Sequence, residues 1–144
     1  EFPKITFHIH DPWGAIQKRD KKLYKGKKNI KFFEFEFDLS KKISSFQAVI
    51  NHLFPNLYKY LNSGILCETM AVGRPLITSK NTSTSHYIEK YKNGLLYDYW
   101  DFSQIANSIL LLSINYSEYK KNAENLSVEW ENLNGLDKIV ELTL

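Results

Sequence analysis

The segment from Asn62 to Ile77 contains the residues whose types and spacing could best support chemistry. Two small residues, Ser63 and Gly64, lead into an apolar stretch that begins at Ile65, which predicts a loop followed by a helix. Unpaired N–H groups at the start of such a helix can bind phosphate. Glu68 lies about one turn inside the helix, where its carboxylate could accept hydrogen bonds from two ribose hydroxyls. The segment could therefore hold a nucleotide; a helix that is merely packed by its apolar residues is the alternative.

The histidines are weaker candidates for a site. His8 and His10 share one side of a predicted strand, a spacing that metals can use, but no third ligand accompanies them and we expect no metal site. His52 falls at the carboxyl end of the strand predicted over residues 48–53, where ligands of α/β proteins gather. It could contact a phosphate or an acceptor, with an ordinary structural role as the alternative.

Short β-rich segments alternate with helical segments along the chain. Strands are predicted over residues 5–9, 29–37, 48–53, 76–78 and 95–97, and helices over residues 15–25, 41–46, 65–72, 87–92, 102–112, 116–130 and 133–142. Alternation in units of about thirty residues indicates a parallel sheet with helices on both faces. The predicted fold class is α/β and Rossmann-like, and residues 1–144 are expected to form a single domain.

Composition narrows the possible function classes. An apolar fraction of 43% suffices for a core, and a net charge of +3 falls short of a dedicated nucleic-acid binder. The single cysteine, Cys67, precludes an internal disulfide and favours a reducing, cytoplasmic location. The most apolar stretch, residues 105–114, is shorter than the roughly twenty residues of a membrane span. The absence of an initial Met suggests a piece of a longer protein.

A dense run of basic residues follows the first predicted strand: Lys18, Arg19, Lys21, Lys22, Lys25, Lys27 and Lys28. The run is either a solvated helix face or a surface that contacts an anionic membrane. Aromatic residues are not interleaved with these lysines, which argues against binding to single-stranded nucleic acid.

Several motifs resemble those of retaining group 1 (family 4-like) GT-B glycosyltransferases. Residues 68–77, Glu-Thr-Met-Ala-Val-Gly-Arg-Pro-Leu-Ile, are similar to the family's donor-site pattern Glu-Ala-Met-Ala-x-Gly-x-Pro-Val-Ile. Residues 93–96, Asn-Gly-Leu-Leu, match a further motif of the family, and residues 101–112 are similar to its Asp-x-x-x-Leu-Ala-x-x-Ile helix. The resemblances run in one order along nearly the whole chain.

This resemblance implies the C-terminal, donor-binding half of a GT-B fold. Glu68 would bind the nucleotide ribose, and the backbone of residues 63–65 would meet the diphosphate and the donor sugar. Phe35, Glu36 and Phe37 lie where the family's base-contacting loop sits. Tyr60 departs from the family, which often has a glutamate beside the donor sugar at this position, eight residues before Glu68.

The resemblance also implies an activity. The whole protein would transfer a hexosyl unit from a nucleoside-diphosphate sugar to a glycan or lipid-linked acceptor in polysaccharide biosynthesis, without any cofactor or metal. Its acceptor site would lie in an N-terminal domain, so the fragment alone should be inactive. It would work in the cytoplasm, at the inner face of the membrane if the basic run binds lipid. The alternatives are a non-catalytic module of the same fold that supports a partner enzyme, which Tyr60 favours, and a nucleotide-binding regulatory domain of unrelated ancestry.

Overall fold

The computed structural model describes residues 5–11, 13–34 and 38–134. The chain divides into two compact units, residues 1–39 and residues 40–144, and each unit is described by itself. The expectation that residues 1–144 form one domain stays a prediction. Among the described residues, none of the helices combines the length and the apolar character that crossing a membrane requires.

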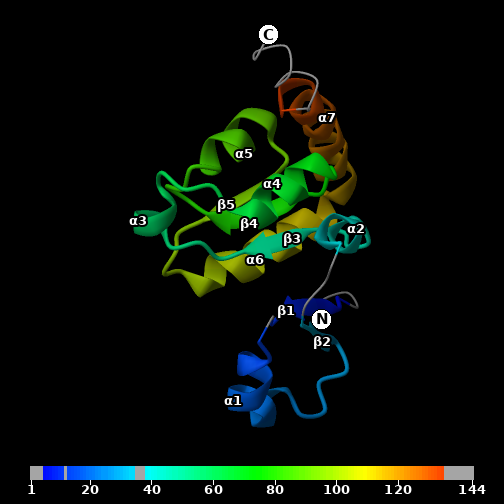
Figure 1. The fold of residues 1–144 in the computed structure, drawn as a ribbon, viewed down its shortest axis with the longest axis vertical. Coiled ribbons are helices and arrows are strands. Elements are labelled where there is room, and N and C mark those ends of the chain that lie inside the picture. The colour runs from blue at the N-terminus through cyan, green and yellow to red at the C-terminus, as the bar shows by residue number, and fades with distance from the viewer. Residues whose placement is uncertain (1–4, 12, 35–37, 135–144) are drawn as a thin grey trace. The chain divides into compact units, whose positions relative to one another are not determined.

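The first unit is a strand–helix–strand arrangement (Figure 1). Its elements are β1 (Phe7–His10), α1 (Ala15–Tyr24) and β2 (Ile30–Phe33). The two strands pair in parallel with Phe7 opposite Ile30. The ring of Tyr24, at the end of α1, meets Phe32 edge to face with ring centroids 5.1 Å apart. This ring contact joins the end of α1 to β2, and α1 lies in the crossover connection that two parallel strands require.

The elements from residue 39 onward alternate in the same way, with every strand parallel to its neighbour. They are α2 (Leu39–Ser44), β3 (Val49–Asn51), α3 (Pro55–Tyr58), α4 (Gly64–Ala71), β4 (Leu76–Ser79), α5 (Ser85–Tyr91), β5 (Gly94–Tyr97), α6 (Phe102–Ile114) and α7 (Tyr116–Asn134). The sheet order is β3-β4-β5. All four residues of the central strand β4 are buried, including the polar side chains of Thr78 and Ser79, because helices cover both faces of a parallel sheet.

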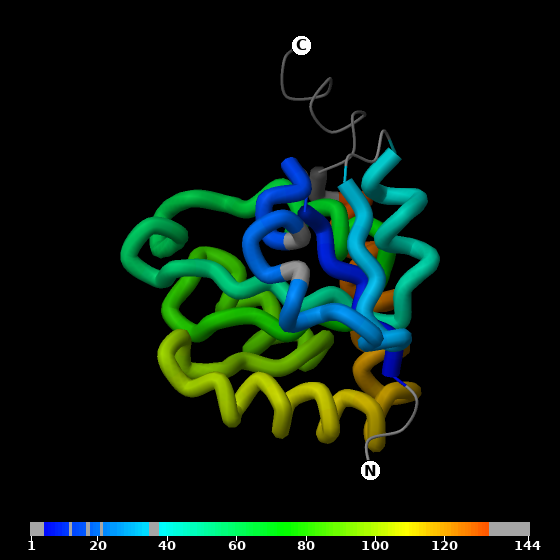
Figure 2. Tube along the Cα trace, turned by 90° about the horizontal axis from the view of Figure 1, so that it is seen from below, coloured from blue at the N-terminus to red at the C-terminus, as the bar shows by residue number. Residues whose placement is uncertain are grey.

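Helices cover both faces of this three-stranded sheet. Leu76 of β4 packs with Leu66 of α4 and Ile88 of α5 on one face. The next residue, Ile77, packs with Leu112 of α6 on the other face, because successive side chains of a strand point to opposite sides. Figure 2 shows α6, in yellow, running beside the sheet. The predicted α/β, Rossmann-like class is confirmed, with the described strands forming one two-stranded and one three-stranded sheet.

Two glycines of the predicted motifs are required by close contacts. Gly73 follows α4 with a φ of 62°, a left-handed conformation that favours glycine. A Cβ on Gly73 would also lie 3.2 Å from Cα of Glu124, so the glycine lets α7 approach α4. Gly94 begins β5, and a Cβ there would collide with the carbonyl group of Leu76 on the neighbouring strand.

The element boundaries differ from the predictions most clearly at Pro55 and in α7. Pro55 lies just after the strand predicted over residues 48–53, where no helix was predicted, but it begins α3, where its missing N–H is not needed. The long helix α7 continues to Asn134, through the break expected after residue 130, and most of the helix expected over 133–142 lies outside the described residues. The helix predicted over residues 102–112 is observed as α6, and Asp101 caps it, since its carboxylate accepts hydrogen bonds from the backbone N–H groups of Ser103 and Gln104.

Candidate functional site

The start of α4 lies beside the carboxyl end of β3. Asn51, the last residue of β3, donates a hydrogen bond from Nδ2 to Oγ of Ser63 at 3.2 Å. The Ser63 side chain makes no capping hydrogen bond to the backbone of α4. Within the described part of the chain, the backbone N–H groups of Gly64 and Ile65 meet no hydrogen-bond acceptor. They are therefore free to donate to an anion.

Gly64 and Glu68 are four residues apart and so share one side of α4. Gly64 is exposed, and a Cβ on it would meet nothing within 4 Å. Glu68 is half-buried one turn further along. The structure thus brings together four of the predicted site residues, Ser63, Gly64, Ile65 and Glu68, with open space beside the helix.

A residue of α2 holds the side chain of Glu68 in place. Its Oε2 atom accepts a hydrogen bond from the hydroxyl group of Ser40. At the other end of α2, the guanidinium group of Arg74 donates hydrogen bonds to the carbonyl oxygen of Ser44. The α2 helix is therefore attached to α4 and to the turn that follows it. Sequence analysis missed Ser40; its only signal is its place in the turn before the predicted helix over residues 41–46.

His52 lies at the carboxyl end of β3, as predicted, but its contacts are with β5 and the loop that follows β5. Its Nδ1 atom lies 2.8 Å from the hydroxyl oxygen of Tyr97, and its ring stacks on Tyr99 with centroids 4.1 Å apart. Partial burial lowers the pKa of His52, so the neutral imidazole is favoured at pH 7. Among the described residues, no contact joins His52 to Ser63 or Glu68.

The remaining predicted residues either make other contacts or lie outside the described part of the chain. Tyr60 is 83% exposed in the loop after α3, and its ring centroid lies 5.4 Å from Nζ of Lys59. Phe35, Glu36 and Phe37 lie outside the described residues, so their contact with a base stays a prediction. His10 stacks on Phe33 with centroids 4.9 Å apart. Over the described ranges, no three His, Cys, Asp or Glu residues come together as a metal site.

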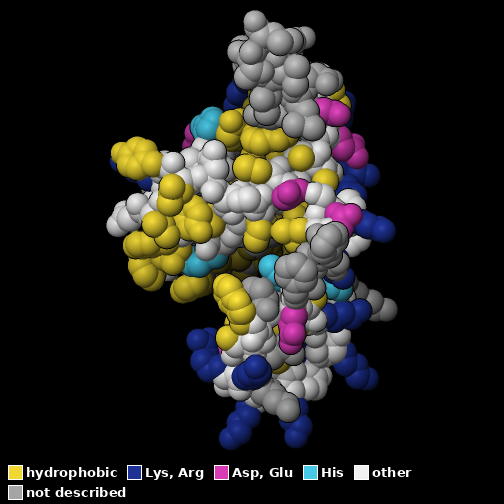
Figure 3. Space-filling view, in the orientation of Figure 1, with side chains coloured by type: hydrophobic (Ala, Val, Ile, Leu, Met, Phe, Trp, Pro, Cys, Tyr) yellow, Lys and Arg dark blue, Asp and Glu magenta, His cyan; other side chains and the backbone are white. Residues whose placement is uncertain are grey.

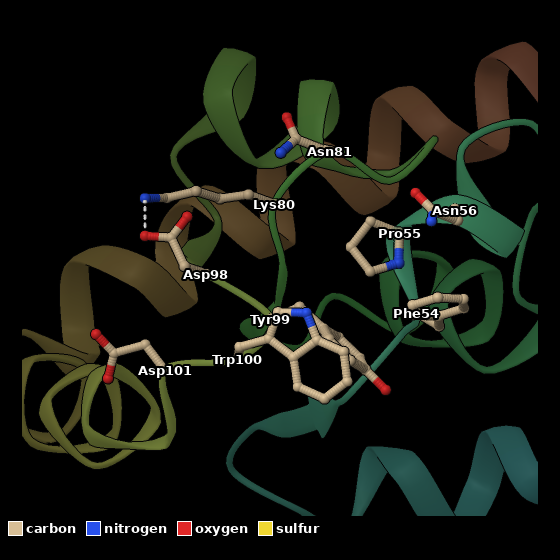
Figure 4. A pocket seen from close by; sticks show the side chains of 9 residues that line it. All are labelled: Phe54, Pro55, Asn56, Lys80, Asn81, Asp98, Tyr99, Trp100 and Asp101. Atoms are coloured by element: carbon tan, nitrogen blue, oxygen red, sulfur yellow. Dashed lines mark hydrogen bonds and ion pairs between the residues drawn. The ribbon is translucent and has the colours of Figure 1, made fainter.

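Sequence analysis also missed a pocket at the carboxyl end of the three-stranded sheet (Figure 4). This edge pocket has a volume of about 600 Å³ and is lined by the loops that follow β3, β4 and β5. Its lining residues are Phe54, Pro55, Asn56, Lys80, Asn81, Asp98, Tyr99, Trp100 and Asp101. None of the predicted site residues is among them. Ligands of parallel α/β sheets bind at this edge, so the pocket is a second candidate site.

No protein-family model and no curated protein sequence matches the chain. Solved structures of HepE, WaaG and TarM are among those that resemble it. HepE of Anabaena, in complex with UDP-glucose, matches 91% of this chain with a TM-score of 0.73 and 19% identity. WaaG, a glycosyltransferase involved in lipopolysaccharide biosynthesis, matches 88% with a TM-score of 0.66 and 18% identity. TarM matches 94% with a TM-score of 0.72 and 21% identity.

The fold is Rossmann-like and of the GT-B kind. The observed fold confirms the expectation that rested on the motifs of residues 68–77 and 93–96. The chain spans 37% of HepE, 34% of WaaG and 27% of TarM. The GT-B-like fold therefore corresponds to a part of each of these proteins.

Proposed function

We propose that the chain is the sugar-nucleotide-binding half of a glycosyltransferase. The observation that carries the proposal is the open start of α4, where Gly64 and Glu68 share one side of the helix beside the carboxyl end of β3. The likeness to a solved structure that holds UDP-glucose supports the same ligand class. A nucleoside diphosphate carries both groups that this arrangement can recognise, the anionic phosphates and the ribose hydroxyls.

In the proposed mechanism, the N–H groups of Gly64 and Ile65 donate to the diphosphate, and the Glu68 carboxylate accepts from the ribose hydroxyls. The hexosyl unit leaves the nucleoside diphosphate and is transferred, with retention, to a glycan or lipid-linked acceptor. Negative charge grows on the departing diphosphate, and fixed N–H donors stabilise it. We expect the acceptor site in an N-terminal domain of the same protein, which would also supply a Lys or Arg to the diphosphate. With those donors, no metal or other cofactor is required.

Nucleotide titration of the isolated chain tests this proposal. Addition of UDP, GDP or ADP should change the chemical shifts of residues 63–68 and 35–37, with a dissociation constant in the millimolar range because half of the cleft is missing. Uridine without phosphates is the matched control and should cause smaller changes at Gly64 and Ile65. A folded sample in which no nucleotide shifts residues 63–68 would contradict the proposal.

A non-catalytic module that supports a partner enzyme is the second candidate. Tyr60 favours it, since this residue replaces a glutamate of the resembled family and is 83% exposed. Incubation of the full-length protein with nucleoside-diphosphate sugars and lipid or glycan acceptors separates the two candidates. Product formation supports the enzyme, whereas nucleotide binding without turnover supports the module. The isolated chain should transfer no sugar in either case.

We also propose that the first unit makes a peripheral contact with an anionic membrane at its cytoplasmic face. Lysine and arginine side chains gather around the unit that carries α1 (Figure 3). Trp13 and Leu23 of the same unit are 83% and 69% exposed, so apolar side chains accompany the charges. The chain should sediment with phosphatidylglycerol vesicles at low salt, and both high salt and the double variant Lys22→Glu, Lys25→Glu should release it. Equal binding to phosphatidylcholine vesicles would exclude an electrostatic contact.

A further inference from the structure

The edge pocket has one wall of exposed aromatic rings. Trp100 is 78% exposed and Phe54 is 41% exposed. Tyr99 lies between them in the contact network, with its ring centroid 5.4 Å from Phe54 and 4.7 Å from Trp100. Figure 4 shows the three rings next to one another at one side of the pocket. Large aromatic rings that stay open to solvent on a folded domain commonly mark a binding surface.

The other wall is polar. Lys80 and Asp98 form an ion pair at 3.0 Å. The side-chain amides of Asn56 and Asn81 are exposed and have no hydrogen-bond partner among the described residues. Asn81 also adopts a left-handed backbone with a φ of 61°, a strained conformation that is often found at binding sites. Both amides can therefore donate to and accept from a ligand.

Buried hydrogen bonds fix the pocket loops that follow β3 and β4. Ser79 Oγ donates to the carbonyl oxygen of Leu53 at 2.6 Å and accepts from its N–H at 3.0 Å, which fixes the loop after β3 against the end of β4. Thr82 Oγ1 lies 3.1 Å from Oγ of Ser85 and 3.2 Å from the carbonyl oxygen of Ser79, which fixes the loop after β4. Two of the three loops of the pocket thus rest on a rigid framework, as pre-organised ligand sites do.

The charges of the pocket disfavour an anionic ligand. The lining contains one cation, Lys80, and two carboxylates, Asp98 and Asp101. Hydrogen bonds from Gln104 and Lys80 lower the pKa of Asp98, so this carboxylate is ionised at neutral pH. Because Lys80 is already paired, a diphosphate or a phospholipid headgroup would meet a net negative surface. A neutral ligand suits the pocket better.

We propose that the edge pocket binds one neutral sugar residue of a glycan. A pyranose has apolar C–H faces, which can stack on the rings of Trp100 and Phe54, and a rim of hydroxyl groups. Those hydroxyls can exchange hydrogen bonds with the amides of Asn56 and Asn81 and with the Asp98 carboxylate. This site goes beyond the proposed nucleotide site, because none of its lining residues belongs to the start of α4.

Titration of the 144-residue chain with maltotriose, cellotriose and chitotriose, and separately with UDP, tests the proposal. At least one trisaccharide should shift the NMR signals of the Trp100 indole N–H and of the Asn56 and Asn81 side-chain amides. Trp100→Ala should raise the dissociation constant roughly three- to tenfold, because one stacking ring is lost. Asn56→Ala, which removes one amide, should also weaken binding. Trp13→Ala removes an equally exposed ring from the other unit and should leave binding unchanged.

Each result of these titrations either supports or overturns the proposed sugar site. Saturable shifts at Trp100 and the two amides that Trp100→Ala weakens would support the sugar site. The proposal is overturned if no trisaccharide shifts these signals in a folded sample, if Trp13→Ala weakens binding as much as Trp100→Ala, or if only UDP shifts them. A failure of UDP to shift residues 63–68 would contradict the proposed nucleotide site and leave the sugar site standing.

Discussion

The start of α4 and the edge pocket both lie at the carboxyl end of the three-stranded sheet, but they are built differently. The start of α4 uses neighbours in sequence, from Ser63 to Glu68, and other elements hold its side chains. Asn51 donates to Ser63, and Ser40 donates to Glu68. The edge pocket instead collects residues from three separate loops and leaves Trp100 open to solvent. The first site is a local motif, whereas the second exists only once the sheet has formed.

The two sites also differ in what lies beneath them. The inner side of α4 is part of the core, since Leu66 and Met70 are almost completely buried. The aromatic wall of the pocket contributes little to that core, because Phe54 and Trp100 remain exposed. Substitutions on α4 can therefore affect both folding and binding, and the two effects have to be measured separately. Substitutions of the exposed rings should affect binding alone.

The largest effect that separates the two regions should be on stability. Leu66 is fully buried against Leu76 and Ile88, so Leu66→Ala should lower the free energy of unfolding by about 2–5 kcal/mol. Trp100→Ala, the matched substitution at the pocket, should change it by less than about 0.5 kcal/mol. Urea unfolding followed by circular dichroism measures both. Similar losses in the two variants would show that the pocket wall supports the fold after all.

The next effect concerns the charge of Glu68. Glu68→Gln keeps the size of the side chain and removes its charge, so nucleotide affinity of the full-length protein should fall roughly ten- to hundredfold. The free energy of unfolding should change by no more than about 1 kcal/mol. Glu89→Gln, on the exposed side of α5, is the control and should alter neither quantity. Calorimetric titration with UDP provides the measurement, and unchanged affinity in Glu68→Gln would remove this residue from the proposed site.

A smaller effect should appear at His52, which connects β3 with the end of β5. Burial lowers its pKa, so the folded protein should show an imidazole titration below the usual value of about 6.5, and unfolding in urea should restore that value. The unfolded chain then binds more protons at acidic pH. The contribution of His52 to stability is therefore complete above about pH 6.5 and falls as the pH drops through its folded pKa. NMR titration of the ring in both states measures the shift, and a folded pKa above the unfolded one would reverse the sign.

Much of this fold could be predicted because the local signals are strong. The helices predicted over residues 65–72 and 102–112 are observed as α4, Gly64–Ala71, and α6, Phe102–Ile114. The alternation of strands and helices correctly indicated parallel strands. The helix α3 was missed, because Pro55 marks the end of a strand and the start of a helix equally well.

The candidate sites likewise combine features that local spacing predicts with contacts that it does not predict. The placement of Gly64 and Glu68 was predictable, because residues four apart along one helix share a side. The contact between Ser40 and Glu68 was not, since 28 residues separate them along the chain. The stack of His52 on Tyr99 likewise joins residues far apart in sequence.

By itself, the sequence determined most of the elements and the motif at the start of α4 that resembles a nucleotide site, because local spacing and backbone preference decide these features. Tertiary structure alone decided which loops meet at the carboxyl end of the sheet. The pairing order β3-β4-β5 places Phe54, Asn81 and Trp100 around one pocket. Strand order depends on the packing of both faces of the sheet, and no short segment of the chain carries that information.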